Sequence, residues 1–361
     1  MIDFRYHLVS LISVFLALAV GIALGAGPLK EAIGDTLTGQ VDQLRAEKDA
    51  LRAELDVTAL DLQHAQASLA SVAPALLEGV LAERRVAIVL VDEVPAEVLE
   101  QVVARLAEAG ASVTATVTVT EAWTDPERLS FRQSLAGTLV TYLDPAPAQD
   151  AGTGTELAEA LAQGLTTAVP ENPDALSENA AIVLDLLGGD AGLITLAGDV
   201  TVPADAVVVL SGPAGSLEAT TAAQDVAAED LAEPTDEEAA LLAARIDAGV
   251  QIATAVQARS TGAVVAGGAL TDPSVVLALR QDESASIQVT TVEDLGTLAG
   301  QVAVPLALAA RISGTVGHYG ASPEATSAMP PRVVLPPVER VAVVVDPATV
   351  TTDAPTAQPE G

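Results

Sequence analysis

The N-terminal end of the chain is dominated by apolar residues. The twenty residues from Leu8 to Gly27 are uncharged and are apolar or small. A helix of that length rises about 30 Å, which matches the hydrocarbon core of a bilayer. The pattern therefore predicts that residues 1–28 form a membrane-spanning segment in contact with lipid.

The residues that flank this segment indicate whether it is cleaved or retained and how it is oriented in the membrane. Small residues between positions 23 and 27 would also suit a signal peptidase, so a cleaved signal is the alternative to a retained anchor. The apolar stretch is longer than a usual signal core, which favours the anchor. Arg5 precedes the span and acidic residues predominate after it, so we expect the bulk of the chain on the extracytoplasmic side of an envelope membrane.

A second pattern follows the apolar segment and has a period of seven residues. Its seam is apolar except for one lysine and consists of Leu37, Val41, Leu44, Lys48, Leu51, Leu55, Leu62 and Leu69. Residues 29–80 are therefore predicted to form a coiled-coil stalk. Glu47 and Arg52 fall where parallel chains pair opposite charges, which predicts a parallel homo-oligomer. An amphipathic helix that packs on its own domain is the alternative.

Between residues 81 and 320, apolar β-branched runs alternate with helical patterns. Strands are predicted at 86–92, 111–120, 206–210, 263–266 and 287–292, and helices at 96–109, 157–168, 175–187, 236–258 and 298–312. The run at 86–92 is apolar and rich in β-branched residues up to its last position, which is typical of a strand buried on both sides. We therefore expect an α/β fold: a three-layer, mainly parallel domain of the flavodoxin or Rossmann type.

The end of the chain, residues 321–361, has a different composition. It contains eight prolines and no long helical pattern. We expect it to be extended or disordered and largely solvated. The apolar segments Val333–Leu335 and Val341–Val345 are candidates for an edge strand or a partner contact.

Charge and cysteine content exclude several functions. The chain carries 16 basic and 49 acidic residues, a net charge of −33, so it offers no basic face for nucleic acid. It contains no cysteine, which excludes disulfides, thiolate metal sites and cysteine nucleophiles. An acidic surface concentrates cations and keeps a domain soluble, and the compositional drift of an alanine-rich genome or a salt-tolerant host is the alternative explanation.

Candidate ligand-binding loops follow the predicted strands, because ligands of open parallel sheets bind beyond the carboxyl ends of the strands. The candidate residues are Asp92, Ser211, Gly212, Gly215 and Asp294. The glycine-bearing loop lacks the spacing of a nucleotide-phosphate motif, and tight turns are the alternative interpretation. The three histidines are far apart in sequence, and no serine lies in a nucleophile elbow. We therefore predict neither an enzyme nor a bound cofactor.

Three short segments resemble one known family. The N-terminal run Met1–Leu11, the apolar residues 14–22 and the late Gly317–Gly320 are similar to the actinobacterial copper transporter MctB family. The resemblance implies passage of copper across the envelope, copper export and copper resistance. His318 and Tyr319, between two glycines, are expected to form a structural turn at the end of the domain.

The sequence contains few side chains that could bind copper(I). Cuprous ions select thiolate and thioether ligands, but cysteine is absent and the only methionines are Met1 and Met329. A tight copper(I) site within one chain is not expected. The alternatives to transport are a non-catalytic oligomeric scaffold of the envelope and an extracytoplasmic module that binds a small ligand.

Overall fold

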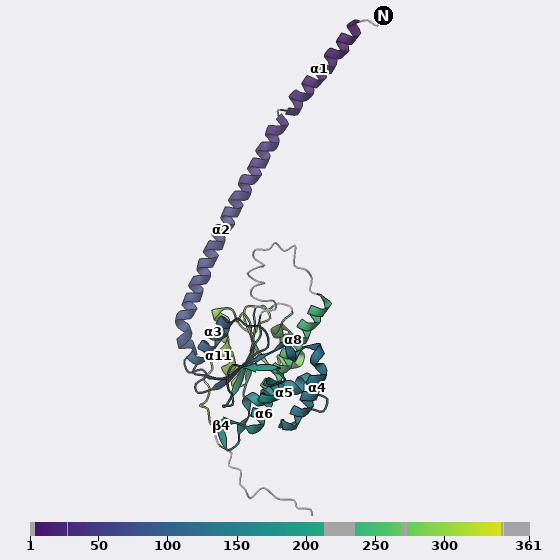
Figure 1. Ribbon diagram of the computed structural model, residues 1–361. Helices are drawn as coiled ribbons and strands as arrows, with labels where there is room; N and C mark the ends of the chain where they lie inside the picture. Colours follow the sequence, from purple (N-terminus) through teal and green to yellow (C-terminus); the bar gives the residue numbers. More distant parts are fainter. Residues whose placement is uncertain are drawn as a thin grey trace, which may run out of the picture. The chain divides into compact units, whose positions relative to one another are not determined.

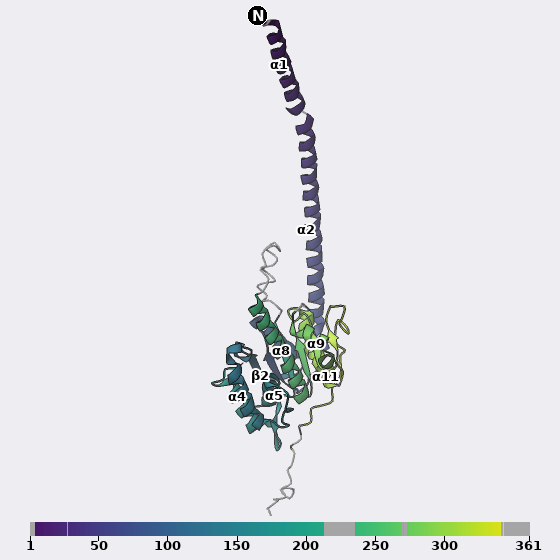
Figure 2. The same ribbon diagram turned by 90° about the vertical axis from the view of Figure 1, so that its right-hand side faces the viewer.

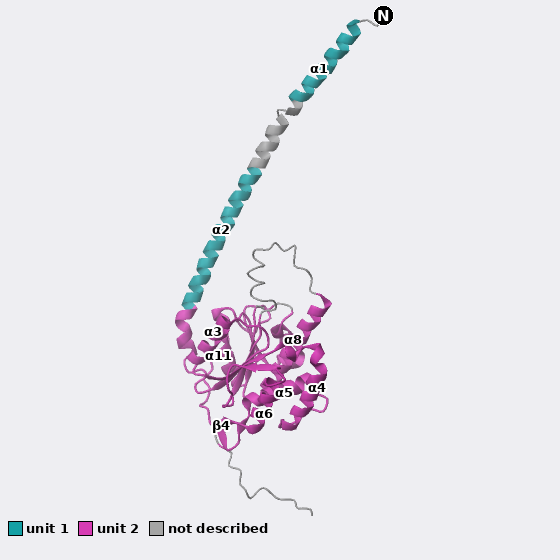
Figure 3. Ribbon diagram, viewed as in Figure 1, with its two compact units in different colours: residues 1–68 teal, residues 69–361 magenta. Residues whose placement is uncertain are grey.

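The chain divides into two compact units, residues 1–68 and residues 69–361, which Figure 3 colours separately. The computed structural model describes residues 4–26, 28–212, 235–268, 270, 273–340 and 342, with 24–26 and 28–38 described by their backbone alone.

The first unit is helical. It contains α1 (Phe4–Ala26) and most of α2 (Pro28–Leu77), whose last residues belong to the second unit. Within α1, the segment Phe4–Ala23 is apolar and long enough to cross a membrane, and none of it is buried. The predicted N-terminal apolar helix is therefore confirmed.

The apolar seam of α2 is open. Five side chains of the seam are between 42% and 67% exposed: Val41, Leu44, Leu51, Leu55 and Leu62. Lys48 is exposed as well, Leu69 is partly buried at the start of the second unit, and the side chain of Leu37 lies outside the described residues. The long helix is thus present, whereas its pairing into a coiled coil stays a prediction.

The second unit is built on a seven-stranded sheet. Its strands, in spatial order, are β5 (Ile194–Leu196), β2 (Ser112–Val119), β1 (Arg85–Leu90), β6 (Ala206–Leu210), β7 (Ala263–Ala266), β8 (Thr290–Val292) and β9 (His318–Tyr319). All neighbours pair in parallel except β5, which is antiparallel to β2. Numbered among themselves, the five strands from β2 to β8 run in the order 2-1-3-4-5, which is the order of flavodoxin-like sheets.

Helices cover both faces of the sheet. One face packs against α4 (Leu129–Leu139), α5 (Thr153–Thr166), α6 (Glu178–Gly188), α8 (Asp236–Arg259) and α9 (Val275–Gln281). The other face packs against α3 (Ala96–Glu108), α11 (Leu298–Ile312) and the end of α2. Figures 1 and 2 show α3 and α11 on the side of the sheet opposite α5 and α8. The remaining elements are α10 (Glu283–Ser286), the hairpin β3 (Ala168–Val169) and β4 (Asn172–Leu176), and three short 3₁₀ turns at 121–123, 126–128 and 140–142.

Strand geometry explains the two cores. Successive side chains of a strand point to opposite faces, so Ile88 enters the core beside α11 and Val89 the core beside α8. Helix α8 is also long and apolar enough to cross a membrane, but it packs on α5 and buries Ile252 and Val256 completely. It is therefore a core helix of this unit.

Several elements differ from the expectations. His318 and Tyr319 do not form a turn; they form the edge strand β9, which pairs with Thr291 and Val292. The sequence patterns also missed α4, α9 and the short strand β5. These elements are short or lie at an edge of the sheet, where the periodic signal is weakest.

The segment 321–340 is attached to the domain, in place of the solvated tail that was expected. Met329 and Leu335 pack against the core beside α11. Arg332 donates hydrogen bonds to the carbonyls of Leu76 and Glu78, at 3.1 and 2.9 Å. The segment therefore caps the end of α2. The expected apolar segment Val341–Val345 lies outside the described residues, apart from residue 342.

Candidate functional site

Three of the predicted site residues meet at the carboxyl edge of the sheet. Asp92 follows β1, and Ser211 and Gly212 follow β6, its parallel neighbour. Strand β2 lies on one side of β1, whereas β6, β7 and β8 follow on the other side. The strand order therefore switches between β1 and β6, and open α/β sheets bind ligands at such a switch point. Gly212 is required there, because a Cβ atom would lie 2.3 Å from the carbonyl oxygen of Glu93.

Two neighbouring pockets at this edge of the sheet differ greatly in volume. The pocket that Asp92 shares with Ser211 and Gly212 has a volume of about 10 Å³, whereas a cavity of about 400 Å³ opens beside it, towards β2 and α8. The larger cavity is lined by polar side chains of both charges and by hydroxyls: Asp92, Glu93, Thr118, Thr120, Glu121, Thr124 and Arg245. A small polar ligand fits this cavity better than the pocket at Ser211.

The charges in the larger cavity are weakly coupled. Arg245 lies 3.9 Å from Glu121, and both side chains are well exposed. Asp92 accepts a hydrogen bond from the backbone N–H of Glu93 at 2.8 Å. Three carboxylates thus face one guanidinium, which gives the cavity a net negative charge.

Ser211 forms no hydrogen bond to a histidine or carboxylate side chain of the described residues. Its side chain is buried, and its hydroxyl contacts the carbonyl of Gly212 at 3.5 Å. His318 is three strands away in the sheet, a separation of about 14 Å, and is hydrogen-bonded to Thr291 instead. Gly215 lies outside the described residues.

Asp294 belongs to a different cavity, on the α11 side of the sheet. This cavity has a volume of about 150 Å³ and is lined by Glu293, Asp294, Gly300 and Met329, among others. Asp294 has a left-handed backbone with φ of 56°. Burial, with the negative charge of Glu293, raises the pKa of Asp294 above its ordinary value. The structure therefore does not bring Asp294 together with Asp92.

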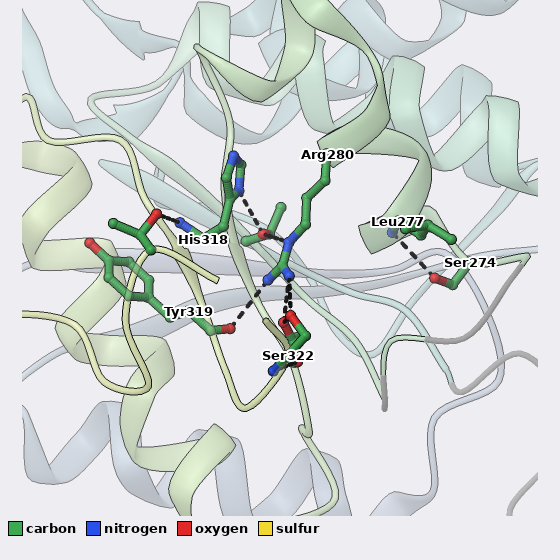
Figure 4. Close-up of polar contacts among 9 residues, drawn as sticks. Ser274, Leu277, Arg280, His318, Tyr319 and Ser322 are labelled. Carbon is green, nitrogen blue, oxygen red and sulfur yellow. Dashed lines mark hydrogen bonds and ion pairs between the residues drawn. The ribbon is translucent and has the colours of Figure 1, made fainter. Parts of the chain in front are cut away.

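A buried ion pair at this end of the sheet was missed by sequence reasoning. Arg280 of α9 contacts Glu293, and their side chains are only 4% and 3% exposed. Arg280 also donates to the hydroxyl of Thr291 at 2.9 Å and to the carbonyl of Tyr319 at 3.3 Å, and Ser322 donates its N–H to Glu293 at 3.1 Å (Figure 4). The network joins α9, β8, β9 and the segment after β9. Its one signal in the sequence is an arginine that follows the apolar residues 275–279.

The network also sets the protonation of its members. Burial alone would raise the pKa of Glu293, but hydrogen bonds from Ser322 and Arg280, with the charge of Arg280, hold that pKa below its ordinary value. Burial, with the positive charge of Arg280, lowers the pKa of His318. The imidazole of His318 is hydrogen-bonded to the hydroxyl of Thr291 through Nδ1, at 2.9 Å.

Similarity to known proteins extends over most of the chain. The family described as "Copper transport outer membrane protein, MctB" matches residues 1–330. The chain belongs to the MctB family. Proteins named "Copper transporter MctB" from Mycobacterium bovis and from Mycobacterium tuberculosis strain H37Rv are each 28% identical over 332 residues, which cover 89% of this chain and 96% of theirs. The resemblance carried by the two ends of the chain is thereby confirmed.

The donor groups of this MctB-family chain are few. Among the described residues, no three histidine, aspartate or glutamate side chains are grouped so that they could hold a metal ion. Of the two methionines, Met329 lies in the described part, where it lines the cavity of Asp294. Copper carried as cargo would therefore encounter carboxylates and one thioether in this part of the chain.

Proposed function

We propose that this chain is a copper transport protein of the cell envelope that contributes to copper export and copper resistance. The observation that carries the proposal is the family match, which runs from the apolar helix through α2 and the α/β domain to residue 330. The relatives that cover nearly the same span are named as copper transporters. Similarity over the whole architecture supports a shared role more strongly than similarity of one motif.

Within this role, α1 is a retained anchor and the α/β domain is extracytoplasmic. The exposed apolar surface of α1 supports insertion into lipid, since large exposed apolar surfaces are rare on soluble proteins. The net charge of −33 argues against a nucleic-acid partner.

We further propose that α2 pairs in parallel with α2 of another copy. Chains anchored in one membrane run in the same direction, and the exposed seam of α2 presents leucines at heptad spacing. Burying these leucines removes apolar surface from water, at about 25 cal/mol for each Å². Lys48 within the seam weakens the pairing but selects one register.

The transport role is tested by the copper content of cells. A strain that lacks the gene is complemented with wild type, with a chain lacking residues 29–80, or with Leu51→Asp, and cellular copper is measured after growth in added copper. We expect the deletion to raise copper content and wild type to restore it. Leu51→Ala is the matched control, because it shortens the side chain without placing a charge in the seam. Unaltered copper content in the deletion strain would overturn the transport role.

The second candidate is a scaffold without transport activity, which the exposed seam of α2 also favours. Liposomes that contain the purified full chain distinguish the two functions. Copper flux above that of empty liposomes supports transport. A stable oligomer without flux supports the scaffold. A melting temperature that rises with a small polar ligand, and falls back when Asp92 is replaced by Asn, would instead support a ligand-binding module.

A further inference from the structure

Residues 78–84 form the joint through which the chain passes from α2 into the first strand of the sheet. The joint contains two residues with a left-handed backbone, Gly79 with φ of 71° and Glu83 with φ of 61°. Glu83 is the unusual one, because residues other than glycine rarely adopt a positive φ and keep it only where their surroundings hold them. The conformation of the joint therefore depends on contacts from outside its own backbone.

The segment 331–340 supplies such contacts on both sides of the joint. Arg332 donates its two hydrogen bonds to carbonyls at the end of α2, which is the helix side of the joint. Arg340 donates to the carbonyl of Glu83 at 2.8 Å, which is the strand side. The guanidinium of Arg340 is itself held by the carboxylate of Asp205 at 2.6 Å, and both of these side chains are about one-fifth exposed. Two arginines of one segment thus bracket the joint.

The joint holds the segment in return. Arg84, the last residue of the joint, is buried and donates to the carbonyl of Pro336 at 3.0 Å. Leu335 packs against the core beside α11. Among the described residues, no backbone–backbone hydrogen bond joins 331–340 to the rest of the domain. The segment is therefore fastened at a few points by arginine side chains and is not paired as a strand.

We propose that residues 331–340 form a strap that locks the joint, and that opening of the strap makes the joint mobile while the sheet stays folded. A segment with few fastening points opens at a lower free energy than the core. Hinges are a few residues at the ends of elements that absorb large changes of φ and ψ, as residues 78–84 would. Because α1 and α2 are joined to the sheet through this joint, the strap sets the stiffness of that link. The strap begins where the family match ends, at residue 330, so the match does not imply it.

Amide hydrogen exchange of the full chain in detergent, followed by mass spectrometry, tests the lock. Arg332→Met and Arg340→Met are combined, because each removes the donor on one side of the joint. We expect peptides that cover residues 74–84 to exchange at least tenfold faster than in wild type, and peptides of β6 and β7 to exchange as before. Arg311→Met is the matched control. Its guanidinium also donates two hydrogen bonds, to α8 and to the residues before β8, so it should leave the exchange of 74–84 unchanged.

A spin label reports on the strap itself. The chain has no cysteine, so Val334→Cys, at a position that is 82% exposed, carries a single nitroxide. We expect its electron paramagnetic resonance spectrum to gain a fast-motion component when Arg332 and Arg340 are both replaced by Met.

Three results would overturn the lock. The first is a spectrum that the double replacement leaves unchanged, and the second is a mobile strap with the exchange of residues 74–84 unaltered. The third is exchange that quickens equally across β6 and β7, because the whole domain would then be destabilised. None of these measurements involves copper, so the lock and the transport role fail separately.

Discussion

Replacing Arg280 by Met tests the buried ion pair that joins α9 to β8 and β9. The substitution keeps an unbranched apolar stem and removes the guanidinium with its charge, together with its contacts to Thr291, Glu293, Tyr319 and Ser322. Breaking a buried pair from one side costs about 3–5 kcal/mol, because the remaining charge stays buried. Ser322 still donates to Glu293, so we expect the lower end, about 3 kcal/mol of unfolding free energy.

The cost is measured by urea unfolding of the full chain in detergent, followed by circular dichroism at pH 7.5. Arg245→Met is the matched control, because Arg245 is exposed and lies 3.9 Å from its partner Glu121, and it should cost less than about 0.5 kcal/mol. In Arg280→Met, the pKa of Glu293 should rise, since burial then acts without the opposing charge. The difference in unfolding free energy between wild type and Arg280→Met should therefore become smaller as the pH falls towards 5.

A double variant tests whether the uncompensated charge of Glu293 causes the loss of stability. Replacing Arg280 and Glu293 together by Met leaves no buried charge, and buried pairs replaced by apolar residues often lose little stability. We expect the double variant to recover at least half of the loss, which is about 1.5 kcal/mol or more of unfolding free energy relative to Arg280→Met. A loss below 1 kcal/mol in Arg280→Met, or a double variant as unstable as the single one, would refute the reasoning.

Three further predictions concern other parts of the second unit. The pKa of His318 is lowered in the folded state, so its neutral form contributes stability that is complete above about pH 6.5 and is lost as the pH falls towards the folded pKa. His318→Gln should therefore make the unfolding free energy depend less on pH between pH 7.5 and 5.5. The same pH dependence as in wild type would contradict this. Arg332→Met removes the two bonds to the end of α2 and should lower the unfolding free energy by about 1 kcal/mol, which denaturant titration measures. Gly212→Ala should cost about 1–3 kcal/mol, because its Cβ would meet a backbone oxygen at 2.3 Å, whereas Gly137→Ala, in an open part of α4, should be neutral or stabilising in the same assay.

Local pattern was sufficient for the elements with a continuous signal. The strands at 206–210 and 263–266 and the helix at 298–312 have the bounds that their apolar runs predict. Each is buried along most of its length, so its composition alone distinguishes it from a loop. The rule that parallel strands end at one edge also explains why Asp92 and Ser211 lie together.

Tertiary structure decided the features that depend on pairing. Strand β9 has two residues and forms only because β8 offers it an open edge, so no local period reveals it. The contact of Arg280 with Glu293 depends on α9 packing across β8, and the contact of Met329 with the cavity of Asp294 depends on where the segment after β9 returns to the domain.

The sequence by itself determined the apolar helix, the long heptad-patterned helix and the alternation that makes a parallel sheet, because these are set by the periodicity of burial along the chain. Which polar groups share a cavity was decided only by the fold, because side chains at the same edge of a sheet can face opposite layers. Asp92 faces the α8 side and Asp294 the α11 side, and that difference separates the two candidate sites.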